Sequence, residues 1–391
     1  MEKTYAIEKH AEWKGKIETK VKCPVDTEED LAVCYTPGVA EACLAIKDDT
    51  ELSFELTGRQ NTVAVITDGT AILGLGNIGP EAGMPVMEGK CALFKKFGNV
   101  DAFPICLRTT DTEEIIRIIE CMQGSFGGIN LEDIAAPRCF EIEERLKKEL
   151  EIPVFHDDQH GTAIVVGAAT INAARILNKE ISSLKVVING AGAAGIAIGK
   201  FLLAMGVEDV VMLNHSGIIC RGEQYKNPAQ SKIAEVTNKR CIKGTLADAM
   251  KGADMFVGVS VGNVLTEEMV KTMAKDPIVF ALANPVPEIN PELALRAGAK
   301  IVGTGSSRYP NQINNALVFP GLFRGVLDVR ARDVTDEMMI AASHGIASAI
   351  SDEELSPSCI LPKAIDINAH KAVAKAVREA AIACGAARLK K

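Results

Sequence analysis

The chain has 391 residues, of which 47% are hydrophobic and 24% are charged, and its formal net charge is −8. A chain of this length is expected to form two domains or three. The negative charge and the lack of a dense Lys/Arg block argue against nucleic acid and anionic membranes as partners. The start of the chain is too charged for a secretion signal, and no apolar run is long enough to cross a bilayer.

Eleven cysteines stand at scattered positions, and no two of them form a C-x-x-C pair. A disulfide framework is not expected in a chain of this length, and the cysteine spacing supports no zinc site. We therefore predict reduced thiols, mostly buried as small apolar residues, in a cytoplasmic protein.

Strands and helices alternate in the first part of the chain, after a polar helical region over residues 11–50 that is interrupted by a turn at 35–38. Val- and Ile-rich runs predict buried strands, and amphipathic runs with Glu/Lys faces predict helices. The predicted elements are strands at 61–70, 102–107 and 154–156, and helices at 87–97, 112–122 and 137–150. A Gly-rich loop over 72–80 follows the first strand. This alternation predicts an α/β domain.

The character of the sequence changes at Gly161, after which an Ala-rich helix is predicted over residues 162–177. The strand–helix alternation that follows predicts a Rossmann-type, doubly wound parallel sheet. The predicted strands are 184–189, 209–214, 255–259, 278–283 and 301–304, and the predicted helices are 196–205, 335–350 and 368–384. We therefore predict two domains, 1–160 and 161–391, the second ending in a helical segment over about 330–391.

A glycine-rich motif marks a predicted dinucleotide site, Gly190-Ala191-Gly192-Ala193-Ala194-Gly195. It follows an apolar strand and opens a helix, the context in which glycines let the backbone approach a pyrophosphate. The competing interpretation is a tight structural turn. The next strand ends in Asn214, where an NAD-specific site is expected to carry Asp or Glu. We therefore predict a preference for NADP, with His215, Arg221 and Lys226 as candidate cations for its additional phosphate.

Two acidic pairs, Glu132-Asp133 and Asp157-Asp158, stand in apolar or Gly-rich surroundings. Buried carboxylates are costly unless something compensates them, and converging oxygens suit Mg²⁺ or Mn²⁺. The competing interpretation is solvated turn residues or helix caps. His156 and His160 flank the second pair as candidate ligands, although packing with a backbone hydrogen bond is favoured for both.

Two further side chains have settings that suit acid–base chemistry. Lys90 follows a glycine on an apolar helix face, and a desolvated lysine near a cation has a lowered pKa and can act as a base. Tyr35 is one of four tyrosines and stands at a Thr-Pro-Gly turn. Taken alone, each has a competing interpretation, a solvated surface lysine for Lys90 and a half-buried packing residue for Tyr35.

Eight short segments between residue 35 and about residue 330 match, in the same order, the sequence signatures of one known family. They are Tyr35–Ala40, Thr67–Thr70 with the Gly-rich loop after it, Met87–Lys90, Asn130–Asp133, Phe155–Ala163, Ala283–Pro285, Pro310–Asn315 and Phe319–Gly321. Together they resemble the signatures of the malic enzyme family, in its short prokaryote-type form without an added acyltransferase domain.

The resemblance implies oxidative decarboxylation of L-malate to pyruvate and CO₂ with NAD(P) and Mg²⁺ or Mn²⁺. The first domain would hold malate and metal, and the second would bind NAD(P). By position, Lys90 would be the general base on the C2 hydroxyl and Tyr35 the acid that protonates the enolpyruvate carbon. Asp157 would orient Lys90 and tune its charge. The resemblance also implies a homodimer or homotetramer.

The binding residues implied by the resemblance fall into two groups. Glu132, Asp133 and Asp158 would ligate the metal. Asn284 and Asn315 would hold the substrate carboxylate, with Asn314 assisting.

Three features depart from the family pattern. Ala71 stands where longer forms carry an arginine, so the cation for the distal malate carboxylate is not identified. Asn214 replaces the usual acidic residue, and Ser306 and Arg308 stand where Arg and Asp are usual.

Two other functions stay open: a Rossmann oxidoreductase with a lysine base and no decarboxylation, and a nucleotide-sensing protein without catalysis. Release of CO₂ and an absolute metal requirement would distinguish a malic enzyme from the other oxidoreductase. The presence of Lys90, Tyr35 and all three carboxylates argues against a sensor, which has no need of them.

Overall fold

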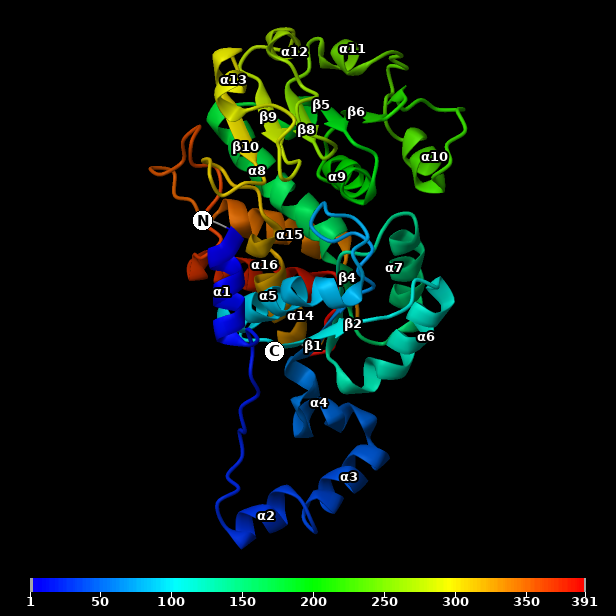
Figure 1. The fold of residues 1–391 in the computed structure, drawn as a ribbon, viewed down its shortest axis with the longest axis vertical. Coiled ribbons are helices and arrows are strands. Elements are labelled where there is room, and N and C mark those ends of the chain that lie inside the picture. Colours follow the sequence, from blue (N-terminus) through cyan, green and yellow to red (C-terminus); the bar gives the residue numbers. More distant parts are fainter. Residues whose placement is uncertain (1–2, 390–391) are drawn as a thin grey trace.

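The computed structural model describes residues 3–389 and contains two mainly parallel sheets, one above the other along the long axis of the molecule (Figure 1). Each sheet is built from strands and helices that alternate along the chain. The predicted α/β fold class, with a Rossmann-type sheet in the second half, is confirmed.

The first sheet has the strand order β2-β1-β3-β4, and all its pairs are parallel. Its strands are β1 (Thr62–Thr67), β2 (Asp101–Cys106), β3 (Gly128–Leu131) and β4 (Val154–His156). Its helices are α5 (Pro80–Gly98), α6 (Thr112–Met122) and α7 (Arg138–Glu149). Only β3 was not predicted, because it is just four residues long and includes Gly128 and Asn130, residue types that are depleted in strands. Pairing with β1 and β4 buries all four of them.

The second sheet has the order β10-β9-β8-β5-β6-β7, parallel except for the short last pair. Its strands are β5 (Lys185–Asn189), β6 (Asp209–Asn214), β7 (Gly217–Ile218), β8 (Met255–Gly258), β9 (Ile278–Ala281) and β10 (Ile301–Thr304). Its helices are α9 (Ala193–Ala204), α10 (Pro228–Ala234), α11 (Leu246–Met250), α12 (Glu267–Lys271) and α13 (Pro291–Arg296). The predicted strands are confirmed, whereas β7 and α10 to α13 were not predicted.

Each sheet has one point where the strand order reverses, and ligands bind at such points in open α/β sheets. In the first sheet β1 lies between β2 and β3, and in the second β5 lies between β6 and β8. The loop at the carboxyl end of β3 carries the acidic pair Glu132-Asp133, and the loop at the carboxyl end of β5 carries the glycine motif.

The C-terminal helices return to the first sheet. These helices are α14 (Phe319–Asp328), α15 (Asp336–Ala347) and α16 (Ile367–Ala383). The rings of Phe319 and Phe323 lie 4.7 and 5.3 Å from that of Phe94 on α5. The predicted boundary after residue 160 falls inside the π helix η4 (Asp157–Gly161), which runs directly into α8 (Thr162–Leu177). The division into functional domains at this residue stays a prediction.

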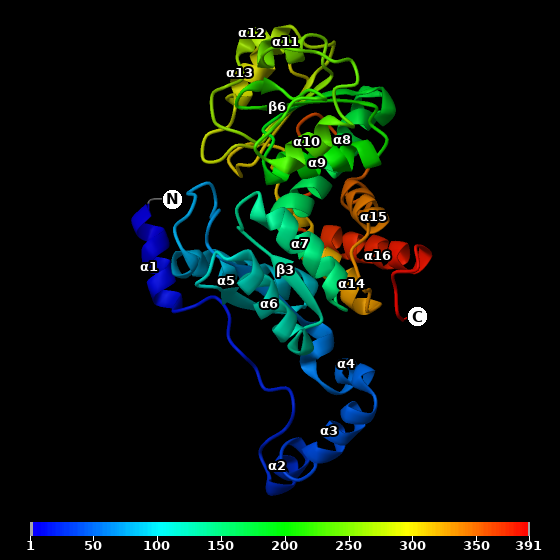
Figure 2. The same ribbon diagram turned by 90° about the vertical axis from the view of Figure 1, so that its right-hand side faces the viewer.

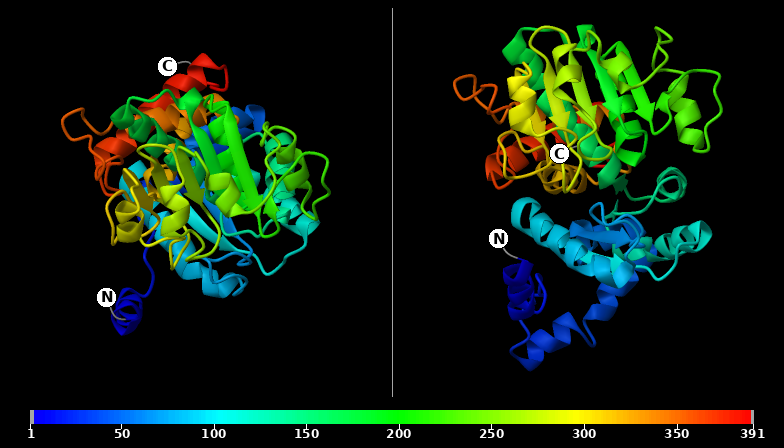
Figure 3. Two further views of the ribbon diagram at one scale, coloured as in Figure 1. Left: turned by 90° about the horizontal axis from the view of Figure 1, so that it is seen from above. Right: turned by 45° about the horizontal axis from the view of Figure 1, so that its top comes forward.

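The N-terminal segment has the helices α1 (Lys3–Trp13), α2 (Glu28–Cys34), α3 (Val39–Asp48) and α4 (Ser53–Leu56). The middle of this segment, with α2 and α3, projects away from both sheets, whereas α1 lies beside α5 and α4 packs on the first sheet (Figures 1 and 2). Neither α2 nor α3 contains a buried residue. We call residues 17–49, which include α2 and α3, the arm; Figure 3 shows it apart from the sheets in another view. The predicted helical region at 11–50 therefore contains the end of α1, an extended stretch and the two short helices α2 and α3.

Short 3₁₀ turns complete the described chain at η1 (Thr50–Leu52), η2 (Gly58–Asn61), η3 (Gln123–Ser125), η5 (Ile181–Ser183) and η6 (Asn315–Leu317). All eleven cysteines are free. Only Cys91, Cys139 and Cys220 are buried, so the prediction that most cysteines are buried is wrong. Over residues 3–389, no helix has both the length and the apolar character needed to span a membrane.

Candidate active site

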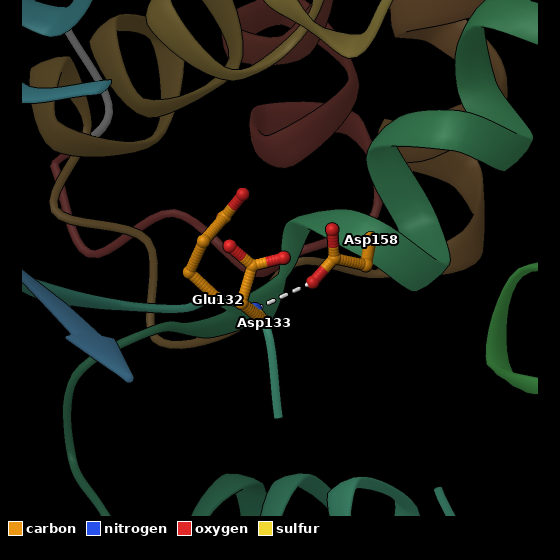
Figure 4. A group of neighbouring side chains, drawn as sticks. All are labelled: Glu132, Asp133 and Asp158. Carbon is orange, nitrogen blue, oxygen red and sulfur yellow. Dashed lines mark hydrogen bonds between the residues drawn. The ribbon is translucent and has the colours of Figure 1, made fainter. Parts of the chain in front are cut away.

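Three carboxylates gather where β3 and β4 end. Glu132 and Asp133 follow β3, and Asp158 lies in η4, which follows β4. One oxygen of each carboxylate lies within 4.8 Å of the others, and the three carboxyl groups project to the same side (Figure 4). Because β3 and β4 are neighbouring parallel strands, their carboxyl ends bring the two acidic pairs together. The structure thus assembles the three residues for which a metal-binding role was predicted.

Burial makes this cluster costly without a compensating charge. Glu132 and Asp133 are each 4% exposed. Burial raises the pKa of both carboxyls, that of Asp133 to about 7, and the charge of Asp158 adds to both shifts. The backbone N–H of Asp133 donates to Asp158 Oδ2 at 2.7 Å, whereas Asp133 Oδ2 is buried with no hydrogen-bond partner. These oxygens therefore have capacity for a cation.

The donor set fits a hard divalent cation. Oxygens that ligate one Mg²⁺ at about 2.1 Å lie at most about 4.2 Å apart, so a separation of 4.8 Å needs only a small movement of a side chain. Donors that are all carboxylate oxygens suit Mg²⁺ or Mn²⁺ better than Zn²⁺. In the described chain neither candidate histidine belongs to the group. His156 Nδ1 lies 3.9 Å from Asp158, and His160 contacts Glu143 instead.

Lys90 projects from α5 into this cluster and is the only lysine or arginine among the buried residues of the described chain. Its Nζ forms ion pairs with Glu132 and Asp157 and lies 4.5 Å from the centre of the Phe319 ring. Burial disfavours the ammonium form, but the charges of Asp157, Glu132 and Asp158 outweigh it and raise the pKa of Lys90. The expected lowering of this pKa is therefore wrong for the arrangement seen here, because carboxylates surround the amine.

Asp157 is fully buried beside Lys90, and burial raises its pKa to about 6. A glycine is required beside it, since a Cβ on Gly161 would lie 1.9 Å from Asp157 Oδ1. The same position would lie 3.2 Å from the Cβ of Asn315, so Asn315 also borders this site. The structure thus brings Lys90 and Asp157 together, with Asn315 at the border of Asp157.

The other two predicted asparagines have different settings. Asn314 uses its side-chain oxygen to accept from the backbone N–H of Ala316, which caps η6. Asn284 is exposed on the loop after β9, and its backbone oxygen would lie 3.1 Å from a Cβ on Gly74 in the Gly-rich loop of the first half. The backbone of Asn284 thus approaches the first half, whereas its side-chain Nδ2 donates to the backbone oxygen of Leu282 at 3.4 Å.

Tyr35 is not brought to the cluster by its own chain. It caps the C-terminal end of α2, its exposed fraction is 67%, and the arm that carries it projects away from α5 (Figures 1 and 2). The physical reason is that α2 and α3 bury no side chain against the rest of the chain, so nothing folds them back. The role of Tyr35 as the acid of the site therefore stays a prediction.

The glycine motif lines a cavity of about 620 Å³ at the carboxyl end of β5. Its lining includes Gly190, Ala191, Gly192, Asn214 and His215. A Cβ on Gly195 would lie 1.8 Å from the oxygen of Gly190, so the turn admits no side chain there. The turn leads into α9, whose N-terminal N–H groups favour an anion.

Asn214 is fixed by its neighbours. Its Nδ2 donates to Gln230 at 3.1 Å, and its Oδ1 accepts from the backbone N–H of Ser216 at 2.8 Å. His215 lines the cavity, but Arg221 and Lys226, which were candidate cations for a 2′-phosphate, do not. The physical basis for an NADP preference is therefore weaker than the sequence indicated.

The nucleotide loop lies next to the first sheet. Ala193, in the glycine motif, packs against the apolar core that includes Ile129 and Leu131 of β3. The carboxylate cluster and the glycine motif thus lie at adjoining edges of the two sheets.

Two residues of the cluster had been given no role from the sequence. Asn130 is fully buried on β3, and its Nδ2 donates to Glu132 Oε2 at 3.0 Å. Its place two residues before Glu132, on the same face of the strand, was a usable signal. Phe319 lies over Lys90 from α14, far away in the sequence, and no local signal indicates that contact.

Comparisons with known proteins agree with this geometry. The model of the malic enzyme N-terminal domain matches residues 14–147, and that of the malic enzyme NAD-binding domain matches residues 159–382. The NAD-dependent malic enzyme of Geobacillus stearothermophilus is 56% identical over 374 residues, which cover 96% of this chain and 78% of the relative. The NADP-dependent malic enzyme of Escherichia coli is 47% identical over 95% of this chain and 51% of its own length.

A solved structure has the same fold. The crystal structure of NAD-dependent malic enzyme from Thermotoga maritima superposes with a TM-score of 0.92 at 50% identity, covering 95% of this chain and 98% of its own.

Without a bound divalent cation, the free energy of unfolding should fall as the pH rises from about 4 to about 7. Burial raises the pKa of Asp133 to about 7 and that of Asp157 to about 6, from 3.8. Between these values the folded protein holds protons that the unfolded chain has lost, so raising the pH favours unfolding. Mn²⁺ needs the ionised carboxylates, so it should raise the melting temperature more at pH 8 than at pH 5. Equal effects of Mn²⁺ at both values, or no difference between wild type and Asp133→Asn, would contradict the assignment.

Substitution in the glycine motif should separate cofactor contact from folding. Nothing lies within 4 Å of a Cβ on Gly192, so Gly192→Ala should leave the melting temperature unchanged yet weaken NADH binding about ten-fold or more, or about 1.4 kcal/mol. Gly195→Ala should lower the melting temperature and also weaken NADH binding, because its Cβ would clash with the backbone oxygen of Gly190. NADH fluorescence titration measures the affinity, and unchanged binding by Gly192→Ala would place the pyrophosphate elsewhere.

Proposed function

The chain belongs to the malic enzyme family, and on that basis we propose that it oxidises and decarboxylates L-malate to pyruvate and CO₂, with NAD(P) as hydride acceptor and with Mg²⁺ or Mn²⁺. The observation that carries the proposal is one buried amine, Lys90, paired with Glu132 and Asp157 beside the three-carboxylate cluster. Oxidative decarboxylation of malate by NAD(P) is the reaction of the family.

Lys90 is the proposed general base. Oxidation at C2 of malate transfers the hydride to the nicotinamide ring and the hydroxyl proton to a base. Lys90 is the only buried side-chain amine of the described chain, and its ion pairs hold it at the edge of the cluster. It is favoured as an ammonium ion here, so it must release a proton before it accepts one. Asp157 is the proposed positioning group, since it contacts the amine and is itself fixed beside Gly161.

The carboxylates and asparagines are the proposed binding groups. A cation held by Glu132, Asp133 and Asp158 would act as a Lewis acid on the C2 oxygen and on the enolate that forms as CO₂ leaves. Asn315 borders Asp157 and can donate to a malate carboxylate. Asn284 is proposed as a second donor, although its Nδ2 here donates to the backbone oxygen of Leu282 at 3.4 Å. Among the described residues no second lysine or arginine is buried, so the cation for the distal carboxylate is not identified within this chain.

The arm supports a homodimer in which Tyr35 serves the partner's site. Leu31, Val33 and Leu44 are 52, 70 and 58% exposed on the arm. Helices of 7 and 10 residues are marginal without packing, so another surface must cover them. A second copy of the chain is the natural cover, because most oligomers are closed and two-fold symmetric. Reciprocal exchange of two arms would place Tyr35 of each chain near Lys90 of the other, where it could protonate the enolpyruvate carbon.

Either cofactor is compatible with the cavity. The pyrophosphate would meet the glycine motif and the start of α9. Of the residues that line the cavity, only His215 could carry a positive charge toward a 2′-phosphate. The preference for NADP stays a prediction, and we propose NAD(P) use with the ratio to be measured.

A turnover assay tests the reaction. With malate, Mn²⁺ and either NAD or NADP, the wild-type protein should release reduced nicotinamide, CO₂ and pyruvate in equal amounts. Lys90→Ala should lower kcat by about 10²-fold to 10⁴-fold while NADH still binds. Lys96→Ala, an exposed position on the same helix, is the matched control. Reduction of the cofactor without CO₂ would indicate another dehydrogenase, and near-normal turnover by Lys90→Ala would remove it as the base.

Mixing two inactive variants tests the exchange of Tyr35. Lys90→Ala and Tyr35→Phe homodimers should each be nearly inactive in pyruvate formation. After subunit exchange, each mixed dimer should contain one site with both residues intact, so about a quarter of wild-type activity should return in a 1:1 mixture. Differently tagged subunits show that exchange has occurred. Mixed dimers that form yet stay inactive would mean that Tyr35 does not act across the interface.

A further inference from the structure

Glu143 is a buried acid on a helix whose other acids face solvent. It lies on α7 and is 6% exposed, whereas the nearby Glu141 and Glu144 are exposed. Neither of its oxygens forms a hydrogen bond or ion pair with the carboxylate cluster or with Lys90, so the proposed reaction leaves Glu143 without a role. A buried carboxylate is costly unless hydrogen bonds compensate it.

All the donors to Glu143 come from one short segment. The backbone N–H of His156 donates to its Oε1 at 3.3 Å, and Gln159 Nε2 donates to its Oε2 at 3.2 Å. His160 Nε2 lies 2.8 Å from Oε1 and 2.9 Å from Oε2. One side chain on α7 thus holds the end of β4 and the last turn of η4.

The segment held in this way carries two residues of the proposed site. Asp157 and Asp158 lie between His156 and Gln159, and η4 aims one at Lys90 and the other at the metal cluster. π helices are rare and occur mostly as single turns at functional sites, so the backbone alone does not specify this geometry. Contacts from a neighbouring helix are what fix it.

We propose that Glu143 is a positioning residue that braces η4 from α7 and so holds Asp157 and Asp158 in the geometry needed for the cation and Lys90. The proposal rests on the proposed function only for the identity of the site. A glutamine at 143 has one accepting oxygen and places an NH₂ group where the carboxylate accepts, so Gln159 and His160 can be satisfied only if they change from donors to acceptors. An alanine satisfies none of them.

Mn²⁺ binding tests this brace without any turnover. The variants are Glu143→Gln and Glu143→Ala, with Glu144→Ala as the matched control on the exposed face of the same helix. Free Mn²⁺ is measured by its electron paramagnetic resonance signal, and NADH fluorescence reports on the second sheet. Partners behind metal ligands typically change affinity about 10-fold to 100-fold, so Glu143→Ala should weaken Mn²⁺ binding by that range and Glu143→Gln by about five-fold or more.

The outcomes separate a brace from general damage. NADH affinity should stay within about two-fold of wild type in Glu143→Gln and in Glu144→Ala, because the nucleotide cavity has no contact with Glu143. If Glu143→Ala loses NADH binding as well, that variant is damaged as a whole, and the Mn²⁺ affinity of Glu143→Gln then tests the proposal. A Glu143→Gln protein that binds Mn²⁺ as tightly as wild type overturns the brace, whether or not malate is turned over. Weakened Mn²⁺ binding in a protein without malic activity would keep the brace and reject the proposed function.

Discussion

The site depends on an imbalance of buried charge. Glu132, Asp133 and Asp157 are buried, Asp158 is partly so, and the only buried cation of the described chain is Lys90. One ammonium ion cannot neutralise four carboxylates in a low-dielectric setting, which is why burial and mutual repulsion raise the pKa values of several of them. A divalent cation would compensate the deficit, and its demand for oxygen donors matches what the cluster offers.

The fold places this charge where a substrate can meet it. In parallel sheets the carboxyl ends of neighbouring strands share one edge, and both acidic pairs lie directly after such ends. The helix α5 supplies Lys90 from one side, and α14 closes the site with the ring of Phe319. Ala193 of the glycine motif packs on the core of the first sheet. The dinucleotide cavity and the carboxylate cluster are therefore close neighbours, as hydride transfer requires.

Much of this could be predicted from the sequence, and the failures have physical causes. The strand-motif-helix context of Gly190–Gly195 and the apolar setting of the acidic pairs are local, so the second sheet and the cluster were predicted. β3 was missed because its burial comes from pairing on both sides. The pKa of Lys90 was predicted in the wrong direction because two carboxylates, distant in sequence, reach it. The position of Tyr35 depends on what covers the arm, and the sequence of one chain does not specify that surface.

The most direct test of this account is to locate Mn²⁺ by anomalous X-ray diffraction from crystals of the protein. We predict one strong peak at about 2.0 to 2.4 Å from carboxylate oxygens, those of Glu132, Asp133 and Asp158, with the Lys90 amine in the same pocket. A peak at another place, in a protein whose activity requires Mn²⁺, would contradict it.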